Sequence, residues 1–152
     1  MTASELRQMD LGPLEALYVE ERPLIEPAGR YRGHVLAWLD SSGARHPLWR
    51  PMSALMFQVS PFGVDFDERC WFFWTRRLSA GRFVPVTGPS RWRDTRTIGL
   101  HYEASRLPEP VRRMLYDEVK PLSETLCLGI GGINAPRGAG ELFFFFSLER
   151  ER

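Results

Sequence analysis

Lysine, histidine and cysteine are scarce in this chain of 152 residues. Lysine occurs once, at Lys120, and arginines balance the carboxylates so that the formal net charge is only +1. A balanced charge provides no general attraction to nucleic acid or to an anionic membrane surface. Aromatic residues beside arginines are also found in sites for single-stranded nucleic acid, but those sites are strongly basic. The sequence therefore predicts no nucleic-acid partner.

The two cysteines, Cys70 and Cys127, lie far apart in apolar surroundings and do not have the spacing of a metal site. We expect two buried free thiols in a reducing cytoplasm, with a disulfide as the alternative. The three histidines have no neighbouring cluster of carboxylates, which predicts no metal site. No cofactor is expected.

Long apolar runs are also missing: none approaches the roughly 20 residues of a membrane span. The N-terminal stretch MTASELRQMDLGPLEALYVEER is acidic, and it lacks the basic start and apolar run of a signal peptide. We therefore expect a cytoplasmic protein without a membrane span, either a monomer or a homodimer.

Short apolar segments bounded by turn residues fill the chain from Arg30 onward. Examples are RYRGHVLAWLD, CWFFWTRRL, RTIGLHYEA and TLCLGIGGI. Few segments of helical length separate them, which favours antiparallel pairing. The fold expected is mainly β: a small antiparallel β-barrel or strongly curved sheet with a short N-terminal helix against it. We assign one domain, 1–152, with 1–28 as the helical N-terminal segment and 29–152 as the barrel.

Four consecutive phenylalanines, Phe143 to Phe146, stand in the last predicted strand. Alternate side chains of a strand point to opposite faces, so both faces of this strand carry aromatic rings. Exposed rings would make an aggregation-prone strand, and both faces must therefore be covered. One face is expected to line the barrel interior. The other is expected to pack against the N-terminal helix through Leu14, Leu17 and Tyr18, which recur at helical spacing.

The stretch Gly29-Arg-Tyr-Arg-Gly33 opens the first strand after an apolar helix. It resembles the opening of the bacterial Gly-x-Trp-x-Gly proteins, with Tyr31 in place of the tryptophan. Tyr116-Asp117, Leu128-Gly129 and the closing FFFFSLER are similar to the second half of that family. The opening also resembles the Gly-x-Trp of lipocalins and other calycins, and this likeness implies a cup for a small apolar molecule.

Candidate reactive residues are spread over several segments. His101 and Glu103 share one face of the strand RTIGLHYEA, opposite Tyr102, and form a proton-handling pair if that face lines the cavity. The alternative is an outward, solvated face. Tyr116 and Asp117 are expected at the barrel mouth, where the Asp orients a substrate hydroxyl or the Tyr donates a proton. The alternative is a helix end, over LPEPVRRMLYDEV, with charged residues in water.

The main hypothesis is that an aromatic-lined barrel cavity binds a small hydrophobic or amphipathic molecule. Trp71 and Trp74 are both wall candidates, since the sequence does not show which faces inward. The alternative is a small cofactor-independent enzyme of the isomerase, cyclase or dehydratase type, with His101 as acid or base. Its candidate catalytic residues are His101, Glu103, Tyr116 and Asp117. The candidate ligand-binding residues are His34, Trp38, Trp71, Phe73, Trp74, Arg96, His101 and Phe144.

Overall fold

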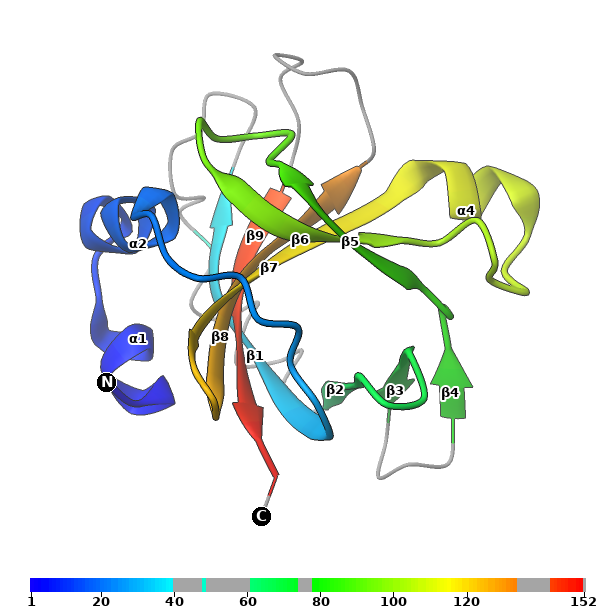
Figure 1. Cartoon of the computed structure of the whole chain (residues 1–152), viewed down its shortest axis with the longest axis horizontal. Helices are drawn as coiled ribbons and strands as arrows, with labels where there is room; N and C mark the ends of the chain where they lie inside the picture. Colours follow the sequence, from blue (N-terminus) through cyan, green and yellow to red (C-terminus); the bar gives the residue numbers. More distant parts are fainter. Residues whose placement is uncertain (40–47, 49–60, 74–77, 134–142, 152) are drawn as a thin grey trace.

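The computed structural model describes residues 1–39, 48, 61–73, 78–133 and 143–151. Strands predominate, and the helices lie at the N-terminal end and before one strand (Figure 1). The helices are α1 (Ala3–Gln8), α2 (Leu11–Val19) and α4 (Glu109–Met114). The strands are β1 (Arg30–Leu39), β2 (Phe62–Asp65), β3 (Cys70–Phe73), β4 (Leu78–Ala80), β5 (Val84–Pro89), β6 (Arg96–His101), β7 (Leu115–Ser123), β8 (Leu126–Ile133) and β9 (Phe143–Arg150).

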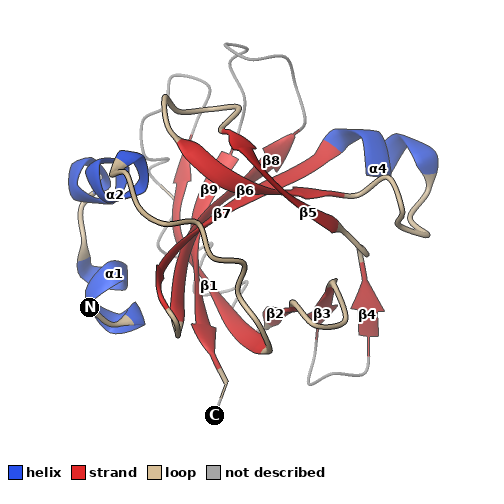
Figure 2. Ribbon diagram, viewed as in Figure 1, coloured by secondary structure: helices blue, strands red, loops and turns tan. Residues whose placement is uncertain are grey.

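These strands form one antiparallel sheet in the order β4-β3-β2-β1-β9-β8-β7-β6-β5. The sheet curls into a half-barrel, and residues 81–83 carry the chain directly from one edge strand to the other (Figures 1 and 2). Pro85 lies in the edge strand β5, where a missing backbone N–H removes no hydrogen bond from a second neighbour. The predicted mainly β fold with a curled antiparallel sheet and a short N-terminal helix is confirmed.

Strand β9 has a buried aromatic ring on each face, as the sequence predicted. Phe145 is fully buried on the outer face of the sheet, where its ring meets the ring of Tyr18 edge-on at 5.9 Å. Phe146 is fully buried in the interior, where its ring lies 5.7 Å from Trp71. The half-barrel therefore has two cores, one within the curl and one between the sheet and the N-terminal helices.

The N-terminal helices cover the outer face of the sheet. Helix α1 begins with a capping box, in which Thr2 and Glu5 each bind the backbone N–H of the other. Leu14, Leu17 and Tyr18 of α2 are buried against the sheet, as their helical spacing predicted. Figure 2 shows both helices on the same side of the curl.

A buried carboxylate, Glu118, holds α2 against the outer face of the sheet through hydrogen bonds. Its side chain is fully buried, and Oε2 accepts hydrogen bonds from the Tyr18 hydroxyl at 2.9 Å and from the Ser90 hydroxyl at 2.6 Å. Oε1 accepts the backbone N–H of Arg91 at 2.6 Å. A buried charge is tolerated when several donors satisfy it. Glu118 thus ties one helix and one loop to β7.

Strand β1 contains a bulge between Val35 and Ala37, where the pairing with β9 shifts by one residue. Leu36 and Ala37 both join the outer core as a result. Trp38 then points into the interior instead of continuing the outward series of His34 and Leu36. Strict alternation along the strand would place His34, Leu36 and Trp38 on one face.

Phenylalanine rings lie over glycines of neighbouring strands. Gly129 pairs with Phe146 across β8 and β9, and a Cβ added to Gly129 would lie 2.3 Å from the ring. Gly131 pairs with Phe144 in the same ladder. The absence of a side chain at these positions leaves room for the rings on the inner face of the sheet.

The segment LPEPVRRMLYDEV is only partly helical. Helix α4 ends at Met114, and Leu115 already begins β7. Tyr116 and Asp117 are therefore strand residues on opposite faces and not the end of a helix. Within the described residues, no helix has both the length and the hydropathy required to traverse a lipid bilayer.

Candidate functional site

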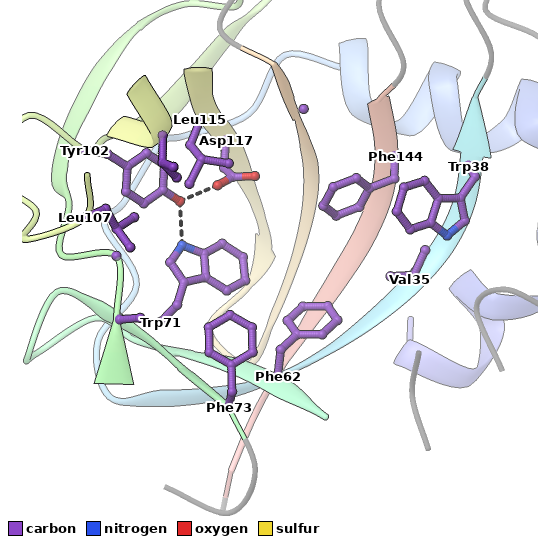
Figure 3. A pocket seen from close by; sticks show the side chains of 14 residues that line it. Val35, Trp38, Phe62, Trp71, Phe73, Tyr102, Leu107, Leu115, Asp117 and Phe144 are labelled. Atoms are coloured by element: carbon purple, nitrogen blue, oxygen red, sulfur yellow. Dashed lines mark hydrogen bonds between the residues drawn. The ribbon is translucent and has the colours of Figure 1, made fainter. Parts of the chain in front are cut away.

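The concave side of the sheet encloses a cavity of about 420 Å³. Small-molecule sites in proteins typically measure about 300–1,000 Å³, so this volume suits a small ligand. Its side chains come from both halves of the curled sheet and from the segment around α4 (Figure 3). The lining residues are Val35, Trp38, Phe62, Trp71, Phe73, Ala80, Gly81, Tyr102, Leu107, Val111, Leu115, Asp117, Gly132 and Phe144.

Aromatic rings make two walls of this cavity. On one side Trp38 and Phe144 lie tilted against each other, with ring centroids 5.1 Å apart. On another side Phe62 and Trp71 are in contact, with centroids 5.7 Å apart. Rings of this kind provide a large apolar surface with few rotatable bonds. The walls can therefore hold a flat or compact apolar molecule.

A chain of hydrogen bonds crosses the apolar lining. The indole Nε1 of Trp71 donates to the hydroxyl of Tyr102 at 2.5 Å, and this hydroxyl donates to Oδ2 of Asp117. Figure 3 shows both hydrogen bonds meeting at the Tyr102 hydroxyl, with the second carboxyl oxygen of Asp117 turned away from Tyr102. Trp71 lies in β3, Tyr102 directly follows β6, and Asp117 lies in β7, so the curl of the sheet brings them together.

Asp117 has an unusual environment for a carboxyl group. The side chain is 8% exposed. Burial disfavours the charged form and raises the pKa to about 7, while the hydrogen bond from Tyr102 opposes the shift. The negative charge of Glu118 on the opposite face raises the pKa further. The carboxyl is therefore poised to gain or lose a proton near neutral pH.

The cavity offers no evident metal ligands. Across the described residues, no group of three or more histidine, cysteine, aspartate or glutamate side chains is placed to hold a metal ion. No arginine, lysine or histidine is found among the described residues that line the cavity. This lining can bury an apolar molecule, and it offers the carboxyl of Asp117 as an acid–base group.

Several residues predicted from the sequence meet in the cavity. Trp38, Trp71, Phe73 and Phe144 line it, and so does Asp117. Trp71 is thus an inward-facing residue. Trp74, the other tryptophan of CWFFW, lies outside the described residues.

Two predicted ligand-binding residues lie elsewhere. His34 is paired with Ser147 on the outer face of β1 and β9, because alternation from the inward-facing Val35 turns it outward. Burial lowers the pKa of His34, and the positive charge of Arg7 lowers it further. Arg96 is exposed at the first residue of β6. Neither residue lines the cavity.

His101, Glu103 and Tyr116 come together in a separate, smaller hollow of about 290 Å³ on the outside of the sheet. The ring of His101 meets the ring of Tyr116 edge-on at 5.4 Å. Arg112 and Arg113 also line this hollow. The proposed pair of His101 and Glu103 therefore faces outward, which is the alternative that the sequence had left open.

Sequence reasoning did not select Tyr102 or Phe62 for the site. The signal for Tyr102 was present, since this polar residue continues the inward series of Ile98 and Leu100. The role of Phe62 depends on the pairing of β1 with β2, two strands separated by more than twenty residues in the sequence. No local pattern reveals that pairing.

Comparison with known proteins provides a fold but no family. No family model matches the chain, and no curated protein matches it. A crystal structure of a protein from Thermomonospora curvata is similar, with a TM-score of 0.53 and 14% sequence identity. The similarity covers 98% of this chain and 93% of that one. At this identity the likeness supports the curled β-sheet fold alone.

Proposed function

We propose that this protein binds a small hydrophobic or amphipathic molecule in the cavity of its half-barrel. The observation that carries the proposal is the cavity of about 420 Å³ with an almost wholly apolar, aromatic lining. Burial of apolar surface contributes about 25 cal/mol per Å², so a compact ligand gains useful affinity before ordering costs. The resemblance of the stretch around Tyr31 to the opening of calycins implies a cup of this kind.

A fluorescence titration tests the proposal. Trp38 and Trp71 both line the cavity, so an apolar ligand that enters it should change the tryptophan emission. A broad panel of small apolar molecules should include saturating responses. Native mass spectrometry of protein purified from its own host should show a bound small molecule. A flat response to the whole panel would contradict the proposal.

Two neighbouring residues of β4 provide a matched pair of variants. Ala80 lines the cavity, whereas Ser79 is exposed on the opposite face of the same strand. Ala80→Phe should fill part of the cavity and weaken binding by about tenfold or more, because the ligand loses buried surface. Ser79→Phe adds the same ring outside and should leave the affinity unchanged. Equal effects of both variants would place the ligand elsewhere.

Acid–base catalysis in the same cavity is the second candidate, and Asp117 is the observation that favours it. Burial holds the pKa of this carboxyl at about 7, in the range that suits a general acid or base. His101, the acid–base residue suggested by the sequence, lines the outer hollow instead. If the bound molecule exchanges a C–H proton with D₂O, Asp117→Asn should slow the exchange about a hundredfold or more. His101→Ala should not change it.

A further inference from the structure

The direction of the hydrogen-bond chain in the cavity follows from its first member. The indole N–H of Trp71 can only donate, so the oxygen of Tyr102 must accept it. The proton of Tyr102 is then directed to Oδ2 of Asp117. The chain therefore ends on a carboxyl oxygen that already has a donor.

The second oxygen of Asp117, Oδ1, lies beside the backbone of Gly131. A Cβ built on Gly131 would stand only 2.2 Å from Oδ1, so the glycine leaves the space that this oxygen occupies. Asp117 lines the cavity, and Figure 3 shows this oxygen directed away from Tyr102 toward the side of Phe144. Oδ1 is thus an acceptor that no hydrogen bond from Tyr102 satisfies.

The other polar atoms of the lining are not open to a ligand. Nε1 of Trp71 and the hydroxyl of Tyr102 are used within the chain. Nε1 of Trp38 is buried in the wall and has no hydrogen-bond partner among the described residues. The cavity surface that remains is apolar except at the carboxyl of Asp117.

We propose that the ligand is an apolar molecule bearing a protonated amine, and that its N–H donates to Oδ1 of Asp117. This inference rests on the proposed function and names the chemical class of the ligand. A carboxylate head group would bring a second negative charge to a site with no described cation in its lining. An ammonium group provides the missing opposite charge, and a charge-assisted hydrogen bond is about twice as strong as a neutral one.

The charges around Asp117 support the same ligand. Tyr102, just after β6, and Trp71 of β3 face the carboxyl. The indole of Trp71 carries no charge, and Tyr102 is neutral near pH 7 because burial and the Asp117 charge raise its pKa. Glu118, Tyr116 and His101 lie on the outer face. An ammonium group within hydrogen-bond reach favours the ionised carboxyl and lowers its pKa. Amine affinity should therefore rise with pH through the free-protein pKa of about 7 and then level off.

Calorimetric titration with four naphthalene derivatives tests the inference. Naphthylmethylamine, naphthylmethanol, methylnaphthalene and naphthoate share one apolar body and differ in the head group. The amine should bind at least about tenfold more tightly than methylnaphthalene, as expected for one hydrogen bond to a charged group. Naphthoate should bind most weakly. Only the amine should gain affinity between pH 6 and pH 8, a range of about one unit on either side of that pKa.

Asp117→Asn removes the charge while it keeps the shape. The preference for the amine over methylnaphthalene should fall to about twofold or less, while methylnaphthalene binds as before. If this variant does not fold, Tyr102→Phe replaces it: losing the Tyr102 hydrogen bond should move the midpoint of the amine pH profile upward.

The outcomes separate the inference from the proposed function. Equal affinities for all four compounds, or a preference for naphthoate, would overturn the amine assignment and leave cavity binding intact. An amine preference that persists in Asp117→Asn would also overturn it. Failure of all four compounds to bind would contradict the proposed function and the inference together.

Discussion

The hydroxyl of Tyr18 donates a hydrogen bond of 2.9 Å to the carboxylate of Glu118, exactly one hundred positions further along the chain. The same hydroxyl lies 3.2 Å from Oγ1 of Thr97, which donates to the backbone oxygen of Val119. All these side chains lie under α2, on the face of the sheet opposite the cavity. The network fixes the helix without contributing to the lining.

Removing the Tyr18 hydroxyl should destabilise the fold without changing the cavity. Tyr18→Phe keeps the ring against Phe145 and removes one donor to a buried charge, a loss of about 1.5–3 kcal/mol. Urea denaturation measures the change in the free energy of unfolding. Ligand binding should be unaffected in the folded variant. A loss below about 0.5 kcal/mol would show that Glu118 is satisfied without Tyr18.

The stability of the unliganded protein should depend on the protonation of Asp117. Its folded pKa of about 7 lies above its ordinary value of 3.8, so the native state holds this proton more firmly than the unfolded chain does. The stabilising contribution is complete below about pH 4 and is lost as the pH rises toward 7. The loss is on the order of 4 kcal/mol, because one pKa unit corresponds to about 1.4 kcal/mol.

Asp117→Asn provides the reference for that measurement, since an amide does not titrate. The difference in unfolding free energy between the protein and this variant should change in favour of the variant from pH 4 to pH 7, and remain constant above. These limits follow from the two pKa values of Asp117, 3.8 and about 7. If the unfolding free energies of the protein and the variant changed with pH in parallel, the pKa of Asp117 would be the same in the folded and unfolded states.

Glycine at position 129 should be required for packing. Gly129→Ala puts a Cβ 2.3 Å from the fully buried ring of Phe146, and overpacking of this kind costs about 1–3 kcal/mol. Gly88→Ala is the matched control, because a Cβ there meets nothing within 4 Å. Thermal and urea unfolding should separate the two variants. Equal stabilities would show that Phe146 moves aside freely.

The cysteines should be unreactive in the native state. Cys127 is fully buried, and burial raises the pKa of its thiol to about 12. Burial also raises the pKa of Cys70. A thiol-specific reagent at pH 8, about the ordinary pKa of a free thiol, should label neither residue until urea is added. Rapid native labelling of Cys127 would indicate local opening of β8.

The fold could be predicted from local sequence patterns because each pattern allowed only one packing arrangement. Four adjacent rings in β9 required two covered faces, and the apolar stripe of α2 supplied one cover. The free and buried cysteines agree with the prediction as well. The glycine-rich stretch TLCLGIGGI formed the expected strand, β8.

The site was harder to predict because it depends on register and on pairing. One bulge in β1 reverses the face of every residue after it, and period-two alternation contains no sign of the bulge. Asp117 was selected for a place at the barrel mouth, with a helix end as the alternative, because the proline-rich start of LPEPVRRMLYDEV masks the strand that follows. The Tyr102 hydroxyl that lowers its pKa lies just after β6, and Trp71, which donates to that hydroxyl, belongs to β3.

The cover of the outer face has a consequence for synthesis on the ribosome. Helices α1 and α2 are translated before β9, but Phe145, a part of their docking surface, belongs to β9. At about 5–20 residues per second, roughly ten seconds separate the two events. Throughout that interval the apolar side of the helices lacks the cover that β9 provides, which makes this segment a natural point of contact for chaperones.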